Sequence, residues 1–165
     1  MMDLSALVHE CTPANVSPQT MQAIMRVESA HRPNAIGYKI IRKSDKKVFH
    51  LTTQPRTKEQ AVGWARWLEA NGFRYDAGAA QVNSINFKKY GLTVETVFEP
   101  CANIYAGARI LTDCFARASQ SIKYEQAALR AALSCYQSGN FKTGFATGYV
   151  SNVVMAASNI ISPPP

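Results

Sequence analysis

The chain has 165 residues, a length typical of one domain. Hydrophobic residues make up 47% and charged residues 18%, which supplies enough apolar material for a core and too little charge for a disordered chain. No run of about 18 apolar residues is present, so no membrane span is expected. No secretory leader pattern is visible at the start, so any export signal is expected to be absent or already removed.

The net charge of +7 favours acidic partners, such as nucleic acid, anionic lipid or an acidic wall polymer. Solubility alone is an equally good explanation of such a charge. The densest basic run, residues 39–47, mixes with apolar residues as a pair of strands would. A nucleic-acid-binding tail is therefore not expected.

Five segments carry apolar residues at helical spacing: about 18–32, 57–71, 100–115, 128–138 and 149–157. Ser17 is expected to cap the first helix, with Pro18 in its first turn, where the missing N–H costs nothing. Thr57 and Gln60 form a plausible capping box for the second. The chain is therefore expected to be mainly α.

Only one region has the alternation typical of strands. Residues 38–43 alternate in character, a polar turn follows, and the segment Val48–Leu51 returns along them. We expect a single β-hairpin here. It begins an insert, about 38–74, within one domain covering residues 1–160, and residues 161–165 form a proline-rich tail that cannot be helical.

The four cysteines, Cys11, Cys101, Cys114 and Cys135, show no C-x-x-C spacing, which argues against a zinc site. An even number allows two disulfides with three possible connectivities, or four buried free thiols. The three histidines have no metal-ligand spacing either. No metal and no cofactor are therefore expected.

Glu28 interrupts an apolar helix face. Met21, Ile24 and Met25 share that face, and the next position on it carries a carboxylate. Burial would raise the pKa of this group and keep it protonated, as a general acid requires. The alternative is that Glu28 is solvated, or paired with a nearby cation such as Arg32.

Two further segments contain polar groups suited to a hydroxylated ligand. In residues 78–83, a turn of small residues is followed by Gln81 and Asn83, whose amides donate and accept hydrogen bonds. In residues 134–140, Tyr136 and Gln137 gather at a helix end. Each segment alone is a weak signal.

Together and in this order, these segments resemble the VirB1-like lytic transglycosylases of type IV secretion systems, within the lysozyme-like superfamily. Residues 27–29, Val-Glu-Ser, resemble the catalytic Glu-Ser, and residues 78–83 resemble its Gly-Leu-Met-Gln-Ile-Asn segment. Tyr136 and Tyr149 resemble two tyrosines of the family, and residues 98–104 the start of its core helix. The resemblance covers roughly residues 11–155.

The resemblance implies a mainly α (α+β lysozyme-like) fold, a helical bundle around a glycan cleft with one small β-hairpin insert. It implies that Glu28 is the single catalytic acid and base, cleaving the bond between N-acetylmuramic acid and N-acetylglucosamine to leave a 1,6-anhydro end. The residues implied to bind substrate are Ser29, Gln81, Asn83, Tyr136, Gln137 and Tyr149.

The resemblance also implies a partner, a location and a disulfide pairing. Peptidoglycan strands and other secretion-system subunits would be the partners, in the periplasm or cell envelope. Cys11 and Cys101 stand at family-like positions, and Cys114 and Cys135 lie on two helices expected to pack together. The expected pairs are therefore Cys11–Cys101 and Cys114–Cys135.

Three alternatives remain open. A hydrolysing lysozyme needs a second carboxylate across the cleft, and Asp76 is the acid that could be placed there. A non-catalytic glycan-binding assembly protein would keep the fold without needing Glu28, and a nucleic-acid module is suggested by charge alone.

In the insert helix, Trp64 is expected on the apolar face, and Trp67 in the core rather than on a sugar-stacking surface.

Overall fold

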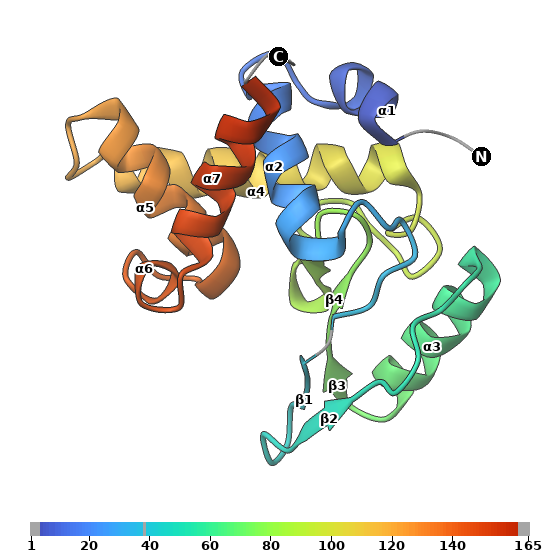
Figure 1. Cartoon of the computed structure of the whole chain (residues 1–165). Helices are drawn as coiled ribbons and strands as arrows, with labels where there is room; N and C mark the ends of the chain where they lie inside the picture. The colour runs from blue at the N-terminus through green and yellow to red at the C-terminus, as the bar shows by residue number, and fades with distance from the viewer. Residues whose placement is uncertain (1–3, 38, 162–165) are drawn as a thin grey trace.

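The computed structural model describes residues 4–37 and 39–161. The longest helix, α4 (Pro100–Ala118), runs behind α2 (Pro18–Ser29) and α7 (Tyr149–Ile161), which pack against each other (Figure 1). Helix α5 (Glu125–Ser138) packs along α4, and the shorter helices α1 (Leu4–Cys11) and α6 (Thr143–Ala146) complete this part. The expected mainly α fold is confirmed.

The five expected helices form, with start signals that differ in detail. Gln60 N–H donates to the Thr57 hydroxyl at 3.1 Å, as a capping box requires. Ser17 precedes α2 with Pro18 at the first helical position, but its side chain makes no capping hydrogen bond. Ile161, the first residue of the expected proline-rich tail, is instead the last residue of α7. The rest of that tail, residues 162–165, lies outside the described residues.

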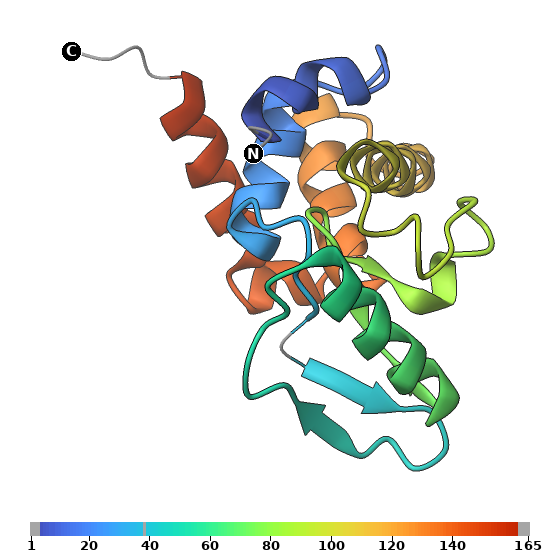
Figure 2. The ribbon, with the colours of Figure 1, turned by 90° about the vertical axis from the view of Figure 1, so that its right-hand side faces the viewer.

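The insert folds as a small sheet covered by one helix, α3 (Lys58–Ala70), which lies across the hairpin in Figure 2. Strands β1 (Lys39–Arg42) and β2 (Val48–His50) form the expected antiparallel hairpin. A third strand, β3 (Phe73–Arg74), pairs with the other edge of β1. Phe49 and Phe73 pack on the side of the sheet that faces α3.

The expectation of one hairpin is incomplete, because a second ribbon is present. Strands β4 (Asp76–Ala77) and β5 (Val82–Asn83) pair antiparallel, and the 3-10 helix η1 (Ser84–Asn86) follows. Neither β3 nor this ribbon could be recognised from alternation, since two-residue strands are shorter than the pattern that identifies a strand. The ribbon presents the turn at 78–81 toward the helices.

Two large hydrophobic clusters and one small cluster form the core of the described residues, and α4 contributes to all three. Ile104 and Leu111 pack with α1, α2, α5 and α7, whereas Ala106 and Ile110 pack with the insert and the β4–β5 ribbon. Within the described residues, no helix combines the length and the apolar character needed to cross a membrane.

Two disulfides hold α4 to its neighbours. Cys11 at the end of α1 is bonded to Cys101 in the first turn of α4, and Cys114 of α4 is bonded to Cys135 of α5. These are the two pairs that the resemblance implied. They close chain separations of 90 and 21 residues, and each is expected to stabilise the fold by about 2–4 kcal/mol, mainly by restricting the unfolded chain.

The expectations for the two tryptophans are wrong. Ala61, Ala65 and Leu68 are the residues of α3 that are buried, whereas Trp64 and Trp67 are 36% and 46% exposed. The reason is that α3 covers a narrow sheet, which can bury one stripe of the helix and no more. The indole rings lie beside that stripe.

Candidate active site

A cleft of about 800 Å³ opens between the two large core clusters. It is bounded by the end of α2, the β4–β5 ribbon, the segment 85–90, α4 and the end of α5. Five of the expected site residues line this cleft: Glu28, Gln81, Asn83, Tyr136 and Gln137. Two others, Ser29 and Tyr149, are buried behind its surface.

Glu28 lies in the last turn of α2, which ends where Ala30 adopts a left-handed conformation. The pKa of this carboxyl is raised to about 8, mainly by burial and to a smaller extent by the charge of Asp76. Tyr149 opposes this shift, because its hydroxyl donates to Glu28 Oε2 at 2.9 Å. The pairing of Glu28 with Arg32 is wrong, since Arg32 Nε donates to the Ser29 carbonyl oxygen at 3.0 Å.

Removing the Tyr149 hydroxyl is expected to raise the pKa of Glu28 above about 8. The phenol stabilises the charged carboxylate, so Tyr149→Phe leaves the protonated form more favoured. Carbon-13 NMR titration of the Glu28 carboxyl measures the shift. Tyr124→Phe, at an exposed position, is the matched control and should leave this pKa unchanged. A Glu28 pKa equal to or lower than that of the parent in Tyr149→Phe would contradict the assigned contact.

Asp76 places a second carboxyl in the same cleft. It begins β4, and Asn83 on the paired strand donates from Nδ2 to Asp76 Oδ1 at 2.9 Å. Burial raises the pKa of Asp76 to about 6, against the lowering effects of the Asn83 hydrogen bond and the Arg74 charge. Asn83 therefore acts in this structure as a partner of Asp76 while still lining the cleft.

The turn between β4 and β5 is fixed by Asn103 of α4, which is fully buried. Its Nδ2 donates to the carbonyl oxygens of Ala77 and Val97 at 2.9 and 2.8 Å, and its Oδ1 accepts from Ala80 N–H at 2.7 Å. Gly78 has a φ of +84°, and a Cβ there would overlap the Asn103 amide. The small residues of this turn therefore allow the backbone to approach α4 closely.

Two expected substrate ligands instead hold this turn. Ser29 is 2% exposed, and its hydroxyl lies 2.7 Å from the Ala79 carbonyl oxygen, to which it donates. The structure therefore does not bring Ser29 into the cleft. Tyr136 lines the cleft, yet its hydroxyl donates to the Ala80 carbonyl oxygen at 2.6 Å.

Gln81, in the β4–β5 turn, and Gln137, at the end of α5, both line the cleft. Gln81 adopts φ +53°, a conformation that costs a non-glycine residue about 1–2 kcal/mol. Its Nε2 donates to the Gly78 and Ala35 carbonyl oxygens at 2.9 and 3.1 Å, which holds the side chain in place. Gln137, at the end of α5, is exposed.

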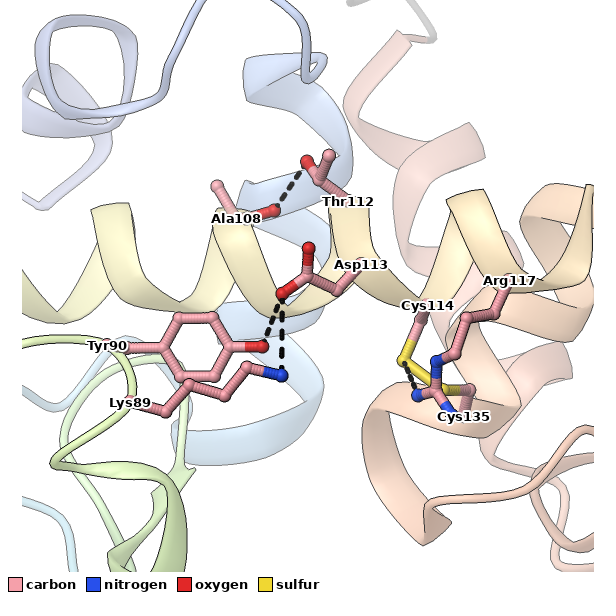
Figure 3. A network of polar contacts seen from close by, with 8 residues as sticks. All are labelled: Lys89, Tyr90, Ala108, Thr112, Asp113, Cys114, Arg117 and Cys135. Carbon is pink, nitrogen blue, oxygen red and sulfur yellow. Dashed lines mark hydrogen bonds and ion pairs between the residues drawn. A yellow bond between two sulfur atoms is a disulfide. The ribbon is translucent and has the colours of Figure 1, made fainter.

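At the far end, the cleft is lined by charged groups that the sequence analysis did not single out (Figure 3). The Tyr90 hydroxyl donates to Asp113 Oδ2 at 2.6 Å, and Lys89 Nζ lies 4.0 Å from the same oxygen. The Arg117 guanidinium lies against the Cys114–Cys135 disulfide, 3.0 Å from Cys135 Sγ. Asp113 and Arg117 are four residues apart, which places them on the same face of α4. This spacing is the feature of the sequence that could have identified them as neighbours in a site.

The arrangement suits acid–base chemistry on a hydroxylated ligand. A carboxyl with a pKa near 8 is protonated at neutral pH and can donate a proton, while the amides and the carboxyl of Asp76 can orient hydroxyl groups. A family model, Transglycosylase SLT domain, matches residues 9–157. The chain belongs to this family.

Alignments with curated relatives cover almost the whole of this chain. It is 42% identical to the "Type IV secretion system protein virB1" of Brucella abortus (strain 2308) over 169 residues, 99% of this chain and 67% of the relative. It is 32% identical to "Protein virB1" of Agrobacterium fabrum and 35% identical to that of Rhizobium radiobacter, with 62% and 61% of those relatives covered. The chain thus spans about two thirds of their length. No solved structure matches it.

Proposed function

We propose that this SLT domain is a peptidoglycan lytic transglycosylase in which Glu28 is the single acid and base. The observation that carries the proposal is the half-buried Glu28 carboxyl, bonded to Tyr149, in a cleft lined by Gln81, Asn83 and Gln137. Burial raises the pKa of this carboxyl to about 8. Membership of the transglycosylase family supports it. No cofactor or metal takes part in the proposed chemistry.

In the proposed first step, Glu28 donates its proton to the oxygen between N-acetylmuramic acid and N-acetylglucosamine. The bond from that oxygen to C1 of the muramic acid breaks, and the sugar's own acetamido oxygen bonds to C1. In the second step, the Glu28 carboxylate removes the proton from the C6 hydroxyl, whose oxygen displaces the acetamido group from C1. Glu28 is again protonated, and the product carries a 1,6-anhydro ring.

Mass spectrometry of the fragments released from purified peptidoglycan tests this reaction. An anhydro end is lighter than a hydrolysed end by one water and has no reducing group. We expect these ends in the digest made by the parent protein. A digest containing reducing ends and no anhydro ends would contradict the proposal.

Hydrolysis of the lysozyme type is a second candidate, because Asp76 does lie in the cleft with Glu28. A hydrolase would use the Asp76 carboxylate as nucleophile or base. The Asn83 hydrogen bond holds Asp76 Oδ1 against the neighbouring strand, which fits a positioning role better than a nucleophilic one. Reducing ends that disappear in Asp76→Asn would establish the hydrolase instead.

Tyr136→Phe is expected to lower the turnover number by about tenfold to a thousandfold, with little change in KM. The proposed reason is that the hydroxyl stabilises the sugar's acetamido group, which carries charge only as the bond breaks. The substitution also removes the hydrogen bond from the Tyr136 hydroxyl to the Ala80 carbonyl oxygen. Steady-state kinetics on soluble glycan fragments measures the effect. A turnover number equal to the parent's would show that Tyr136 has no role in the reaction and serves only in the hydrophobic core.

The biological setting of this reaction is part of the proposal. Relatives named as type IV secretion proteins support action in the periplasm or cell envelope, where local cleavage would open the wall for a secretion apparatus or conjugation pilus. Other subunits of that apparatus would be its protein partners. The predicted binding residues, including Gln81, Asn83 and Gln137, would contact the glycan strand.

A further inference from the structure

The insert carries two exposed tryptophans that the proposed reaction does not use. Trp64 and Trp67 lie on the same side of α3, with ring centroids 5.9 Å apart. Trp67 stacks on Phe73 at 6.0 Å and contacts Phe49 at 6.1 Å. We call these four residues the aromatic platform; neither tryptophan is among the residues that line the cleft.

Packing alone does not account for the two indoles. Both remain more than a third exposed, although Ala61, Ala65 and Leu68 already close α3 onto the sheet. Exposed aromatic side chains grouped in this way are typical of binding surfaces. The ring contacts hold the indoles in place before a ligand arrives, so little conformational freedom is lost on binding.

The charge of the insert indicates what the platform binds. Nine of the 18 Lys and Arg residues, but three of the 11 Asp and Glu residues, lie in residues 38–74, so this segment carries +6 of the net charge of +7. The β1–β2 turn exposes Lys43, Lys46 and Lys47. This turn adjoins the end of α3, because Lys43 N–H donates to the Gly72 carbonyl oxygen at 2.8 Å.

We propose that the aromatic platform and the basic turn form a second, non-catalytic binding site for peptidoglycan strands. Pyranose rings have apolar C–H faces that stack on indoles, and the peptides on the strand carry carboxylates that the lysines attract. The inference rests on the proposed function, since its occupant is the polymer that the cleft would cleave.

Sedimentation with purified wall sacculi tests the site, using Glu28→Gln protein so that binding is measured without cleavage. Adding Trp64→Ala and Trp67→Ala is expected to weaken binding by about tenfold or more, as loss of central aromatic contacts does. Tyr124→Ala, at a residue 83% exposed just before α5, is the matched control and should bind as the Glu28→Gln parent does.

The basic turn is tested separately. Lys43→Glu with Lys47→Glu should weaken binding to intact sacculi, and the loss should shrink as salt is added. On sacculi stripped of their peptides, this charge variant should bind like the parent while the tryptophan variant stays weak. Lys123→Glu with Lys142→Glu, two exposed lysines outside the insert, is the charge control.

Thermal melting establishes that each variant is folded. If loss of the Trp67–Phe73 contact unfolds the double variant, binding by the single variant Trp64→Ala and by the charge variant still tests the proposed site. The proposal would be overturned if the folded tryptophan and charge variants both sedimented with sacculi as the parent does. It would also be overturned if these variants lost binding to single-stranded DNA and kept binding to sacculi. Failure of the proposed function is a separate result, because it is read from the anhydro ends made by protein with Glu28 intact.

Discussion

Glu28→Gln is expected to reduce peptidoglycan cleavage by at least about a thousandfold. Glutamine keeps the shape of the side chain and can still accept the hydrogen bond from Tyr149, but it has no proton to donate to the glycosidic oxygen. Release of anhydro fragments from sacculi measures the loss. Glu10→Gln, at an exposed position on α1, is the matched control and should cleave like the parent.

The same substitution is expected to make the fold more stable. The pKa of Glu28 rises from its ordinary 4.5 to about 8 on folding, so folding becomes less favourable as the pH rises from 4.5 to 8. Glutamine does not titrate and removes this dependence. At pH 8, denaturant unfolding should show Glu28→Gln to be more stable by about 4 kcal/mol, and at pH 4 the two proteins should be equal.

Two results would contradict the role given to Glu28. Cleavage near the parent rate by folded Glu28→Gln would remove this residue from the chemistry. A parent pH–rate profile whose activity persists well above pH 8 would also count against it, because the acid must be protonated at the start of the reaction.

Asn103→Leu is expected to lower the free energy of unfolding by about 3–5 kcal/mol. Leucine has a similar volume but removes the hydrogen bonds of Asn103 to the Ala77 and Val97 carbonyl oxygens and to the Ala80 N–H. For a chain of this size, the midpoint of thermal unfolding should fall by about 10 °C. Cleavage should fall as well, since the turn carrying Gln81 loses its support.

Asn152→Leu, at an exposed position on α7, is the matched control for this change. Its unfolding free energy should stay within about 0.5 kcal/mol of the parent's. Equal effects of Leu at positions 103 and 152 would show that the buried amide does not hold the turn.

Local sequence patterns determined much of the helical framework and the position of Glu28. The 3.6-residue period of Met21, Ile24 and Met25 placed the carboxyl on a buried face, because that period is set by the backbone of one helix. The hairpin of β1 and β2 was also predictable, since each strand is long enough to show alternation or to follow a recognisable turn.

Contacts between distant segments were decided by the tertiary structure alone. Ser29 is next to Glu28 in the sequence, yet it bonds to Ala79 behind the cleft because adjacent helical residues face different directions. Tyr149 reaches Glu28 across 121 residues, and no local pattern encodes that approach. The exposure of Trp67 likewise depends on the width of the sheet beneath α3. Periodicity in the sequence indicates which side of a helix or strand is apolar. Which other segment covers that apolar side depends on how the whole chain packs.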